Sequence, residues 1–423
     1  MNTVLRPSIQ TRSVINRKAY VKHPPPRRIE TSPENLRILR DTVAVLVPAH
    51  NEEKDIAATI DSLKNLTRTP DQIVVISDNS SDKTVDIAKG MGVTVLETSG
   101  NTYKKAGALN TGFRHLIKEG TIPEFVVTMD ADTVFDPDFL KTGLNVMSFD
   151  KKLGVLSAVC EGKKGLASLP SWPPKRAAHL DDRYQNTYSL LVKFVFSFIV
   201  SIFNMAIIWM QEVEYARAGT LRIRSDIHTM SGAGSIIRAE PILQLLASKQ
   251  QRNTATACLY AERDDNLVED FTLTLDIKKL GWRCTNNYYS IAHTDLMRTL
   301  PTLVRQRKRW VRGTIDELRR RKFSREARTS SLVMIFGLSI LPLFYLWPVL
   351  IIHGIARGTT SIADLWLLAL MGVYQAWMSH KMGWKSMLVI LTVIPDLIYS
   401  VIRHYWVISS VIMSYRSKQQ HWE

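Results

Sequence analysis

Four short apolar runs, each separated from the next by a helical stretch, constrain the fold of this 423-residue chain more than any other feature. The runs are rich in β-branched residues and lie at 43–49, 72–77, 93–97 and 125–130. Between them, apolar residues recur at the spacing of one helix face, as at Ile56, Ile60 and Leu63. This alternation predicts an α/β domain whose mostly parallel, Rossmann-like sheet carries helices on both faces.

Polar side chains follow three of the predicted strands, at the edge where parallel sheets bind their ligands. They occupy residues 50–53, 78–82 and 130–132. No GxGxxG or GxxxxGK[ST] phosphate loop is present. Asp130 and Asp132 would face the same way while Ala131 turns aside, and two such oxygen ligands suit Mg²⁺ or Mn²⁺ bridging a diphosphate. An Asp-x-Asp pair by itself is also typical of a solvated turn.

The net charge of +16 is concentrated in two blocks. Residues 1–40 hold nine Lys and Arg against Glu30 and Glu34, and residues 305–328 hold eleven against three acidic residues. Such blocks suit anionic lipid headgroups or nucleic acid. Because no aromatic-interleaved basic surface or base-reading motif accompanies them, we expect a membrane partner and no nucleic acid.

The C-terminal part predicts an α-helical transmembrane region over 331–415. Residues 331–356 contain no Asp, Glu, Lys or Arg, and a run of 26 residues is long enough to cross a bilayer. Shorter apolar runs follow, so we expect a multi-pass protein with two to four crossing or re-entrant elements. The cations directly before this region predict that the preceding domain lies on the cytoplasmic side.

A second apolar stretch, at 188–210, falls inside the predicted α/β domain. A single crossing there would place Asp130 and Asp132 on one side of the membrane and later polar motifs on the other. One site cannot be divided by a bilayer, so we expect this segment to be re-entrant, interfacial or buried in the protein.

The motifs together resemble the family 2 glycosyltransferases, which have a GT-A fold and use nucleotide-diphosphate sugars. The resemblance covers roughly residues 42–312. The segments that carry it are VPAHNEE at 47–53, SDNSSDKT at 77–84, KAGALNTG at 105–112, MDADT at 129–133, SGAGSIIR at 231–238, LVEDFTL at 267–273 and QRKRW at 306–310. The last fits the Q-x-x-R-W pattern of the membrane-bound, processive branch, which includes cellulose, hyaluronan, chitin-oligosaccharide and poly-N-acetylglucosamine synthases.

The resemblance implies roles for donor-binding residues and for a base. Glu52, Asp78 and Lys105 would bind the nucleotide donor, with Lys105 meeting phosphate or pairing with the acidic residues. Asp130 and Asp132 would hold the metal ion and the diphosphate. Asp270 would act as general base, accepting the proton of the acceptor hydroxyl. The local sequence leaves an alternative, because Asp270 or its neighbour Glu269 could cap the following helix.

The resemblance also implies a set of residues at the acceptor and diphosphate: Gly232, Gly234, Glu269, Gln306, Arg309 and Trp310. The glycines would let the backbone approach the acceptor, Arg309 would neutralise leaving charge, and Trp310 would offer an apolar face to a sugar ring. Trp310 could instead anchor the chain at a membrane interface.

The expected organisation is a basic arm at 1–40, a GT-A domain at 41–312, a basic juxtamembrane linker at 313–330 and the membrane region at 331–415. The expected function is that of a membrane-anchored, inverting glycosyltransferase that moves sugar from UDP-GlcNAc or UDP-Glc to a glycan acceptor. If the chain follows the branch that it resembles, it adds sugars processively. Two alternatives stay open: transfer of a single sugar to a lipid or protein, and non-catalytic binding of a nucleotide sugar.

Overall fold

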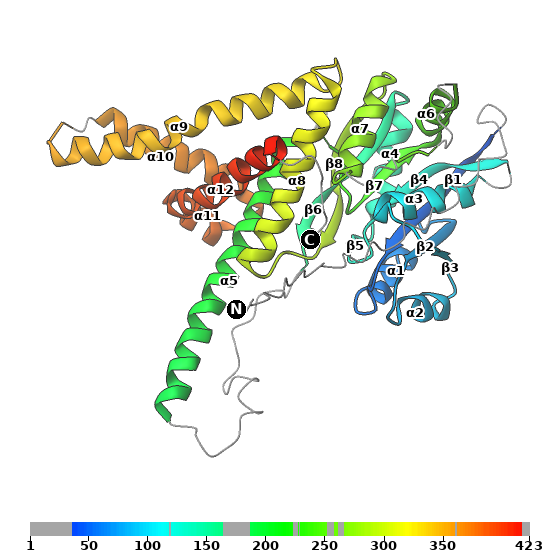
Figure 1. Ribbon diagram of the computed structural model, residues 1–423, viewed down its shortest axis with the longest axis horizontal. Helices are drawn as coiled ribbons and strands as arrows, with labels where there is room; N and C mark the ends of the chain where they lie inside the picture. The colour runs from blue at the N-terminus through cyan, green and yellow to red at the C-terminus, as the bar shows by residue number, and fades with distance from the viewer. Residues whose placement is uncertain are drawn as a thin grey trace, which may run out of the picture.

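The computed structural model describes residues 36–117, 120–163, 187–222, 227, 229–251, 258–260, 266–359 and 362–416. Eight strands form one sheet in the order β3-β2-β1-β4-β7-β6-β8-β5 (Figure 1). The strands are β1 (Arg37–Ala49), β2 (Gln72–Asp78), β3 (Thr94–Thr98), β4 (Thr121–Thr128), β5 (Val134–Phe135), β6 (Leu153–Gly162), β7 (Ser235–Arg238) and β8 (Arg283–Thr294). The helices are α1 (Ile56–Lys64), α2 (Thr84–Gly90), α3 (Lys104–Leu116), α4 (Phe139–Phe149), α5 (Thr187–Arg222), α6 (Ala239–Gln251), α7 (Glu269–Lys279), α8 (Leu300–Arg321), α9 (Arg328–Ala356), α10 (Ile362–Met378), α11 (Trp384–Leu391) and α12 (Ile394–Arg416).

The first four strands confirm the predicted parallel sheet. β1 pairs in parallel with β2 and β4, and β2 pairs in parallel with β3. Alternate residues of β1 enter two different cores: Leu46 packs with residues of α3, α6 and α7, and Val45 packs with residues of α1, α2 and α4. Helices therefore cover both faces, as the doubly buried apolar runs indicate.

The other half of the sheet is mixed, although four of the seven pairings among the described strands are parallel. β7 is antiparallel to both β4 and β6, β6 is parallel to β8, and β5 is antiparallel to β8. β7 has only four residues and joins the sheet between strands that precede it by many residues. Such a pairing depends on long-range contacts, and the local sequence pattern does not encode it.

The first strand begins before the predicted domain boundary. Leu36 is buried, and Arg37 already pairs with Thr121 of β4. A register shift between Leu39 and Val43 separates the two parts of β1, and Asp41 has a positive φ there. The predicted arm at 1–40 therefore ends before residue 36, and its earlier residues lie outside the described ones.

Helix α5 contains the apolar stretch at 188–210. It is one continuous helix whose first half projects from the body, with Val195, Ile199 and Phe203 exposed (Figure 1). Its second half is packed, with Ile207 and Val213 buried. A continuous helix does not turn back within the membrane, so the re-entrant alternative does not fit, whereas an interfacial helix that is buried in the protein at its end fits the described part of α5.

The pairing of β4 with β7 shows whether α5 separates the candidate site residues that precede it from those that follow it. β4 precedes α5 and β7 follows it, yet the two strands are paired from Phe125–Arg238 to Thr128–Ser235. Strands of one hydrogen-bonded sheet lie on one side of a bilayer. The described α5 therefore does not separate the carboxylates after β4 from those of α7.

The basic segment at 313–330 is mainly helix rather than linker. Helix α8 continues to Arg321, and Lys322 and Phe323 form a turn with positive φ before α9. Arg321 is paired with Asp276 at 2.8 Å and with Glu317 at 2.8 Å. Part of the positive charge is thus neutralised within the protein, which the count of cations does not show.

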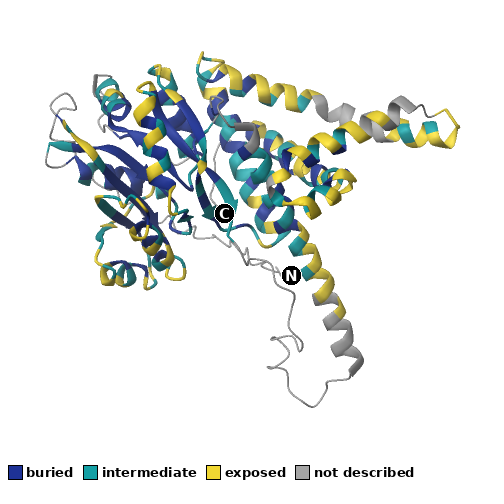
Figure 2. Ribbon diagram, turned by 180° about the vertical axis from the view of Figure 1, so that it is seen from behind, coloured by how far each residue is buried: buried dark blue, intermediate teal, exposed yellow. Residues whose placement is uncertain are grey.

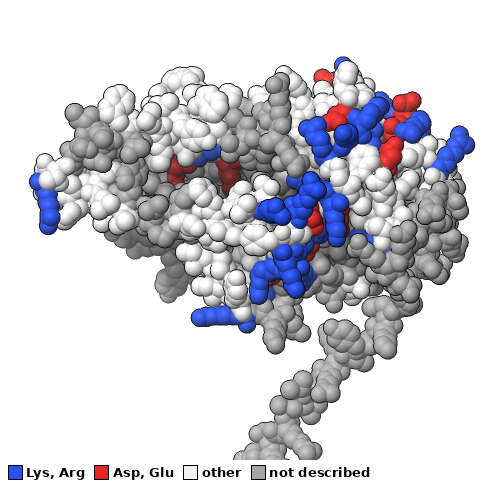
Figure 3. All heavy atoms as spheres, turned by 90° about the horizontal axis from the view of Figure 1, so that it is seen from above, with Lys and Arg blue, Asp and Glu red and all other residues white. Residues whose placement is uncertain are grey.

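Helices α9 to α12 form a helical region beside the sheet, and α9 and α10 project from it (Figure 1). Exposed residues follow these projecting helices (Figure 2), and many are large and apolar, including Phe336, Val349, Ile352, Trp366 and Trp377. Seen from above, the part of the surface formed by the projecting helices is largely white, with few charged side chains among the described residues (Figure 3). An apolar surface of this extent is typical of a membrane or protein interface.

One helix, α12, is long and apolar enough to cross a membrane, among the residues that the structure describes. The described residues therefore do not support the predicted multi-pass topology. In α9, the side chains at 340–345 and 347–348 lie outside the described ones, so the predicted crossing at 331–356 falls partly outside them.

Candidate functional site

The loops after β1 and β2 are tied to each other at the carboxyl edge of the sheet. Asn51 has a φ of 57°, and its Oδ1 accepts a hydrogen bond from the Ser81 amide at 2.8 Å. The amide of Glu52 donates to Thr84 Oγ1 at 2.8 Å. Asn and Asp tolerate the left-handed conformation better than other non-glycine residues, which explains their abundance in these loops.

Asp78 ends β2 and is buried, with 8% exposure. Its Oδ1 accepts hydrogen bonds from the Thr98 hydroxyl at 2.7 Å, from Asn101 Nδ2 at 2.8 Å and from Asn79 Nδ2 at 3.0 Å. These contacts orient the carboxylate, and Oδ2 keeps its own acceptor capacity. This arrangement is compatible with the predicted contact to a nucleotide.

Asp130 and Asp132 lie on the loop after β4, separated by a buried Ala131. The hydroxyl of Thr59 lies 2.6 Å from the carbonyl oxygen of Ala131 and fixes the loop from inside. Because β4 ends at Thr128, the pair lies outside the strand, and both aspartates are partly exposed whereas Ala131 is buried. Burial, followed by the negative charges of Asp130 and Asp295, raises the pKa of Asp132 to about 6.

Glu52 lies in the same negative field. Burial is the main cause that raises its pKa to about 7, and the charges of Asp132 and Asp55 add to it. Two carboxyls with raised pKa values mark a place where negative charge is incompletely neutralised by the protein. A bound cation would neutralise it.

Lys105, near the start of α3, connects the two acidic parts of the site. Its Nζ forms an ion pair with Asp130 Oδ1 and lies 3.5 Å from Glu269 Oε1. It also lies 3.4 Å from the carbonyl oxygen of Gly232. Of the two roles expected for Lys105, the structure shows the pairing with acidic residues.

Asp270 lies in the first turn of α7, beside Glu269. The N-cap residue is Val268, so neither carboxylate is the cap, although Asp270 Oδ1 accepts the Phe271 amide at 2.7 Å. Burial, followed by the charge of Glu269, raises the pKa of Asp270 to about 7, against the opposing effect of Lys105. A carboxyl with a pKa near neutrality is suited to proton transfer.

Gly232 brings these groups together. A Cβ placed on it would lie 2.9 Å from Lys105 Nζ, 3.5 Å from Asp270 Oδ2 and 3.7 Å from Asp130 Oδ2. The predicted base, the lysine and one predicted metal ligand therefore surround one glycine, which leaves the space between them open.

Gly234 has a different environment from the one expected for an acceptor-binding glycine. A Cβ there would lie 2.7 Å from the ring of Phe135 and 3.3 Å from Ala158. Packing in the core therefore gives a sufficient reason for this glycine.

The Q-x-x-R-W residues lie on α8. Gln306 and Trp310 are one turn apart and therefore share a face, with Arg309 beside it. The charge of Arg309, after burial, lowers the pKa of Lys104, which places Arg309 near the start of α3. Trp310 lies under the guanidinium of Arg307 at 4.4 Å.

Two polar clusters were not predicted from the sequence. Lys163, at the end of β6, pairs with Asp55 at 2.9 Å and with Asp295 at 3.2 Å beside the carboxylates. Arg307 pairs with Glu214 of α5 at 3.0 Å. The position of Asp295 directly after a strand was the available signal for the first cluster. Arg307 of the second cluster lies in a block of cations, and the sequence does not show which of these cations is buried.

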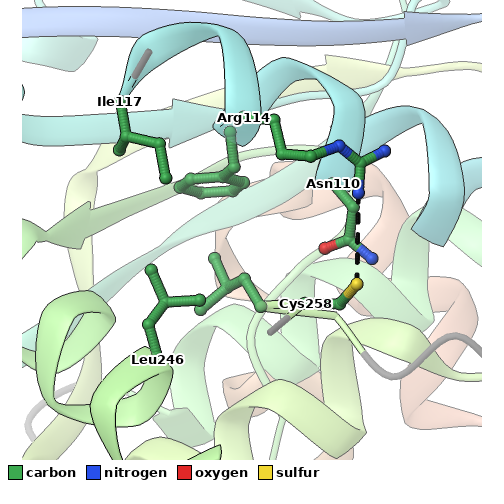
Figure 4. Close-up of a pocket in the computed structure, with 7 residues that line it drawn as sticks. Asn110, Arg114, Ile117, Leu246 and Cys258 are labelled. Atoms are coloured by element: carbon green, nitrogen blue, oxygen red, sulfur yellow. Dashed lines mark hydrogen bonds between the residues drawn. The ribbon is translucent and has the colours of Figure 1, made fainter. Parts of the chain in front are cut away.

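A shallow recess beside Gly232 is lined by Lys105, Thr128, Tyr260, Glu269 and Asp270, among others. A second hollow lies between α3 and α6 and is lined in part by Cys258 and Leu259 (Figure 4). Its lining is mainly apolar, and its polar contact joins Arg114 to Cys258 Sγ at 4.0 Å. The polar candidate residues therefore line the first recess and not the second.

The donor set fits a divalent metal ion held partly by its substrate. Within the described residues, no group of three or more His, Cys, Asp or Glu could hold a metal ion. Asp130 and Asp132 would supply two hard oxygen ligands, and the diphosphate of a nucleotide sugar would supply others. Mg²⁺ is commonly bound in this way, through one or two carboxylates and substrate phosphates.

The comparison with protein families agrees with this geometry. Residues 44–208 match the model of glycosyl transferase family 2. This segment is therefore similar to glycosyl transferase family 2 domains. The matched segment holds the loops with Glu52, Asp78, Lys105, Asp130 and Asp132, whereas α7 and α8 lie beyond it.

Relatives of known sequence match part of the chain. An uncharacterized protein of Methanocaldococcus jannaschii is 33% identical over 133 residues, which are 31% of this chain and 53% of that protein. The 4,4'-diaponeurosporenoate glycosyltransferase of Staphylococcus aureus is 28% identical over 136 residues, which are 31% of this chain and 35% of that protein. The chain thus spans about half the length of the first relative and about a third of the second.

A solved structure resembles the chain beyond the family 2 domain. It is the mannosyltransferase PcManGT of Pyrobaculum calidifontis, in complex with GDP-Man and Mn²⁺. The likeness has a TM-score of 0.50 at 15% identity and covers 89% of this chain and 88% of that one. It supports a GT-A-like fold for the sheet domain.

Proposed function

We propose that the protein is an inverting glycosyltransferase that uses a nucleotide-diphosphate sugar and a divalent metal ion. The observation that carries the proposal is the arrangement around Gly232, where Asp130, Lys105 and Asp270 converge. The family 2 match supports the reaction class, and PcManGT, whose complex holds GDP-Man and Mn²⁺, supports the choice of donor and metal.

The proposed reaction is a single displacement at the anomeric carbon. The acceptor hydroxyl forms the new C–O bond, its proton passes to Asp270, and the bond to the diphosphate breaks with its electron pair on the leaving group. Asp130 and Asp132 would hold Mg²⁺ or Mn²⁺, which when bound would supply positive charge that stabilises the diphosphate. Attack from the face opposite the leaving group inverts the anomeric centre.

The remaining site residues would bind the two substrates. Glu52 and Asp78 would bind the nucleotide end, and Arg309 would meet the diphosphate from α8. Trp310 and Gln306 would bind the acceptor, with Glu269 and Gly232 at the junction. We place the domain at the cytoplasmic face of a membrane, attached through the apolar helices, because the cations of α8 directly precede α9.

Three acceptor classes follow from the same site. A growing glycan would agree with the Q-x-x-R-W residues and the processive branch. Transfer of one sugar to a lipid would agree with the exposed apolar helices beside α8, and transfer to a protein is the third. The non-catalytic alternative, binding of a nucleotide sugar, has no feature of the described site in its favour.

The test is a donor screen with the purified full-length protein in lipid nanodiscs. UDP-GlcNAc, UDP-Glc and GDP-Man are supplied separately with Mn²⁺, and released nucleoside diphosphate is measured. We expect release with one donor and a product whose mass has increased by one sugar or by a series of sugars. Binding of a donor without release in the presence of glycan and lipid acceptors would favour the non-catalytic alternative.

A further inference from the structure

Arg307 lies on the buried side of the helix that carries Gln306, Arg309 and Trp310. Its side chain is 5% exposed, and its Nη2 donates to Glu214 Oε2 of α5 at 3.0 Å. Its guanidinium carbon lies 4.4 Å from the ring centre of Trp310 and 5.8 Å from that of Tyr215. The flat cation therefore forms one wall against which the Trp310 ring rests.

Helix α12 reaches the same carboxylate. The hydroxyl of Tyr399 donates to Glu214 Oε2 at 2.9 Å, so one oxygen receives hydrogen bonds from α8 and from α12. Tyr399 is 6% exposed and is itself fixed by an edge-to-face contact with Trp406, with ring centres 5.7 Å apart. The Glu214 side chain is 38% exposed, whereas its two donors are buried, and hydrogen bonds to a charged group are stronger than those between neutral groups.

The same two helices also meet through an exposed pair, which provides a reference. Lys308 Nζ lies 3.3 Å from the Tyr405 hydroxyl, and Tyr405 is 57% exposed. This pair joins neighbouring positions of α8 and α12, but no described contact connects it to Trp310. An exposed contact of this kind contributes little.

We propose that Tyr399, Glu214 and Arg307 are positioning residues through which α12 sets the orientation of Trp310. The proposal rests on the proposed function, in which Trp310 binds the acceptor. The donor loops after β1, β2 and β4 lie outside this chain of contacts. Helix α12 is the one described helix that is long and apolar enough to span a membrane. A change in how α12 packs would therefore alter the reaction with the acceptor and leave donor binding intact.

The experiment compares Tyr399→Phe with the matched control Tyr405→Phe in the full-length protein in nanodiscs. With the donor and acceptor found in the screen, Tyr399→Phe is expected to lower kcat/KM for the acceptor about tenfold, the effect of one lost hydrogen bond to a charged group. The affinity for UDP in the presence of Mn²⁺ should stay within about twofold of that of the unaltered protein, which is less than the effect of one lost hydrogen bond. Tyr405→Phe should change neither quantity.

A second measurement needs no substrate and so separates this proposal from the proposed function. The protein is labelled with 5-fluorotryptophan, and the ¹⁹F resonance of Trp310 is assigned with Trp310→Phe. We expect this resonance to move in Tyr399→Phe and to stay in place in Tyr405→Phe. If it moves while no donor is turned over, the contact chain stands and the reaction class is wrong.

Two outcomes would overturn the proposal. One is a Trp310 resonance that is unchanged in Tyr399→Phe. The other is a Trp310→Phe, Tyr399→Phe double variant whose losses multiply, since residues that act through one another are not additive. If Tyr399→Phe fails to fold, Glu214→Gln replaces it, because the amide keeps an acceptor for Tyr399 but loses the charge that holds Arg307.

Discussion

Lys105 Nζ is paired with Asp130 and lies 3.5 Å from Glu269 Oε1, so one cation joins the loop after β4 to the first turn of α7. These two acidic elements are about 140 residues apart in the chain. Without a cation between them, Asp130, Glu269 and Asp270 would repel one another. The lysine of the KAGALN segment therefore helps to assemble the site before any substrate binds.

The first prediction concerns metal removal. Asp130 and Asp132 would supply two ligands, and burial, followed by the charges of Asp130 and Asp295, raises the pKa of Asp132. EDTA should abolish sugar transfer, and Mg²⁺ or Mn²⁺ should restore it. UDP titrations with and without Mn²⁺ provide the control, since binding should weaken with the metal absent. Full transfer by metal-free protein in EDTA would exclude the proposed site.

The second prediction separates the base from the donor site. Asp270→Asn keeps the shape of the side chain but removes its basicity, so transfer should slow by about 10²–10⁴. UDP binding should persist in this variant. Asp132→Asn should lower both UDP affinity and rate. If Asp270→Asn transfers sugar at nearly the original rate, Glu269 becomes the next candidate for the base.

The third prediction concerns pH. Because the pKa of Asp270 is raised to about 7, more of the group can accept a proton as the pH rises through 7, and kcat/KM should rise with it. Glu269 contributes to the increase in pKa, whereas Lys105 opposes it. Glu269→Gln should therefore move the rising limb to lower pH. A profile that is flat between about pH 6 and 8 would contradict the role of Asp270.

The fourth prediction uses two nearby glycines as a matched pair. In Gly232→Ala the new methyl group meets the mobile end of Lys105, so the protein should fold with little change in Tm while its transfer rate falls. In Gly234→Ala it meets the ring of Phe135 in the core. Overpacking of this kind should lower the free energy of unfolding by about 1–3 kcal/mol. Equal effects of both changes on Tm would contradict the assignment.

The fifth prediction concerns the sides of the membrane. Lys151 and Lys279 are exposed residues that precede and follow α5. Single cysteines at these positions should react with an impermeant maleimide from the same, cytoplasmic side of membrane vesicles. Because the sheet joins both regions, labelling from opposite sides would be incompatible with the fold.

Much of the parallel half of the sheet could be predicted from the sequence. Val45 and Leu46 belong to a run that is apolar at every position, which indicates a strand buried on both faces. The loops that follow such strands meet at one edge, so Asp78 and Asp130 could be placed together. By contrast, the placing of β7 depends on its partners in β4 and β6, which no local pattern reveals.

The site was predictable in its residue types but only partly in its contacts. Asp270 was identified by its motif, yet its distance from Lys105 depends on how α7 packs against the sheet. Arg307 was one of eleven cations in a basic block. Its burial is set by Glu214 and Tyr399, which come from other helices, so the sequence of α8 alone could not distinguish it from its exposed neighbours.

The central place of β7 has a consequence for the nascent chain. After synthesis of α5, β1 to β4 are complete, but the free edge of β4 has no partner until residues 235–238 emerge. An unpaired strand edge is a template for aggregation. The apolar half of α5 thus becomes available to lipid before the sheet can close. We therefore expect synthesis at a membrane surface to protect the unfinished domain, and translation that stops between α5 and β7 to yield an aggregation-prone fragment.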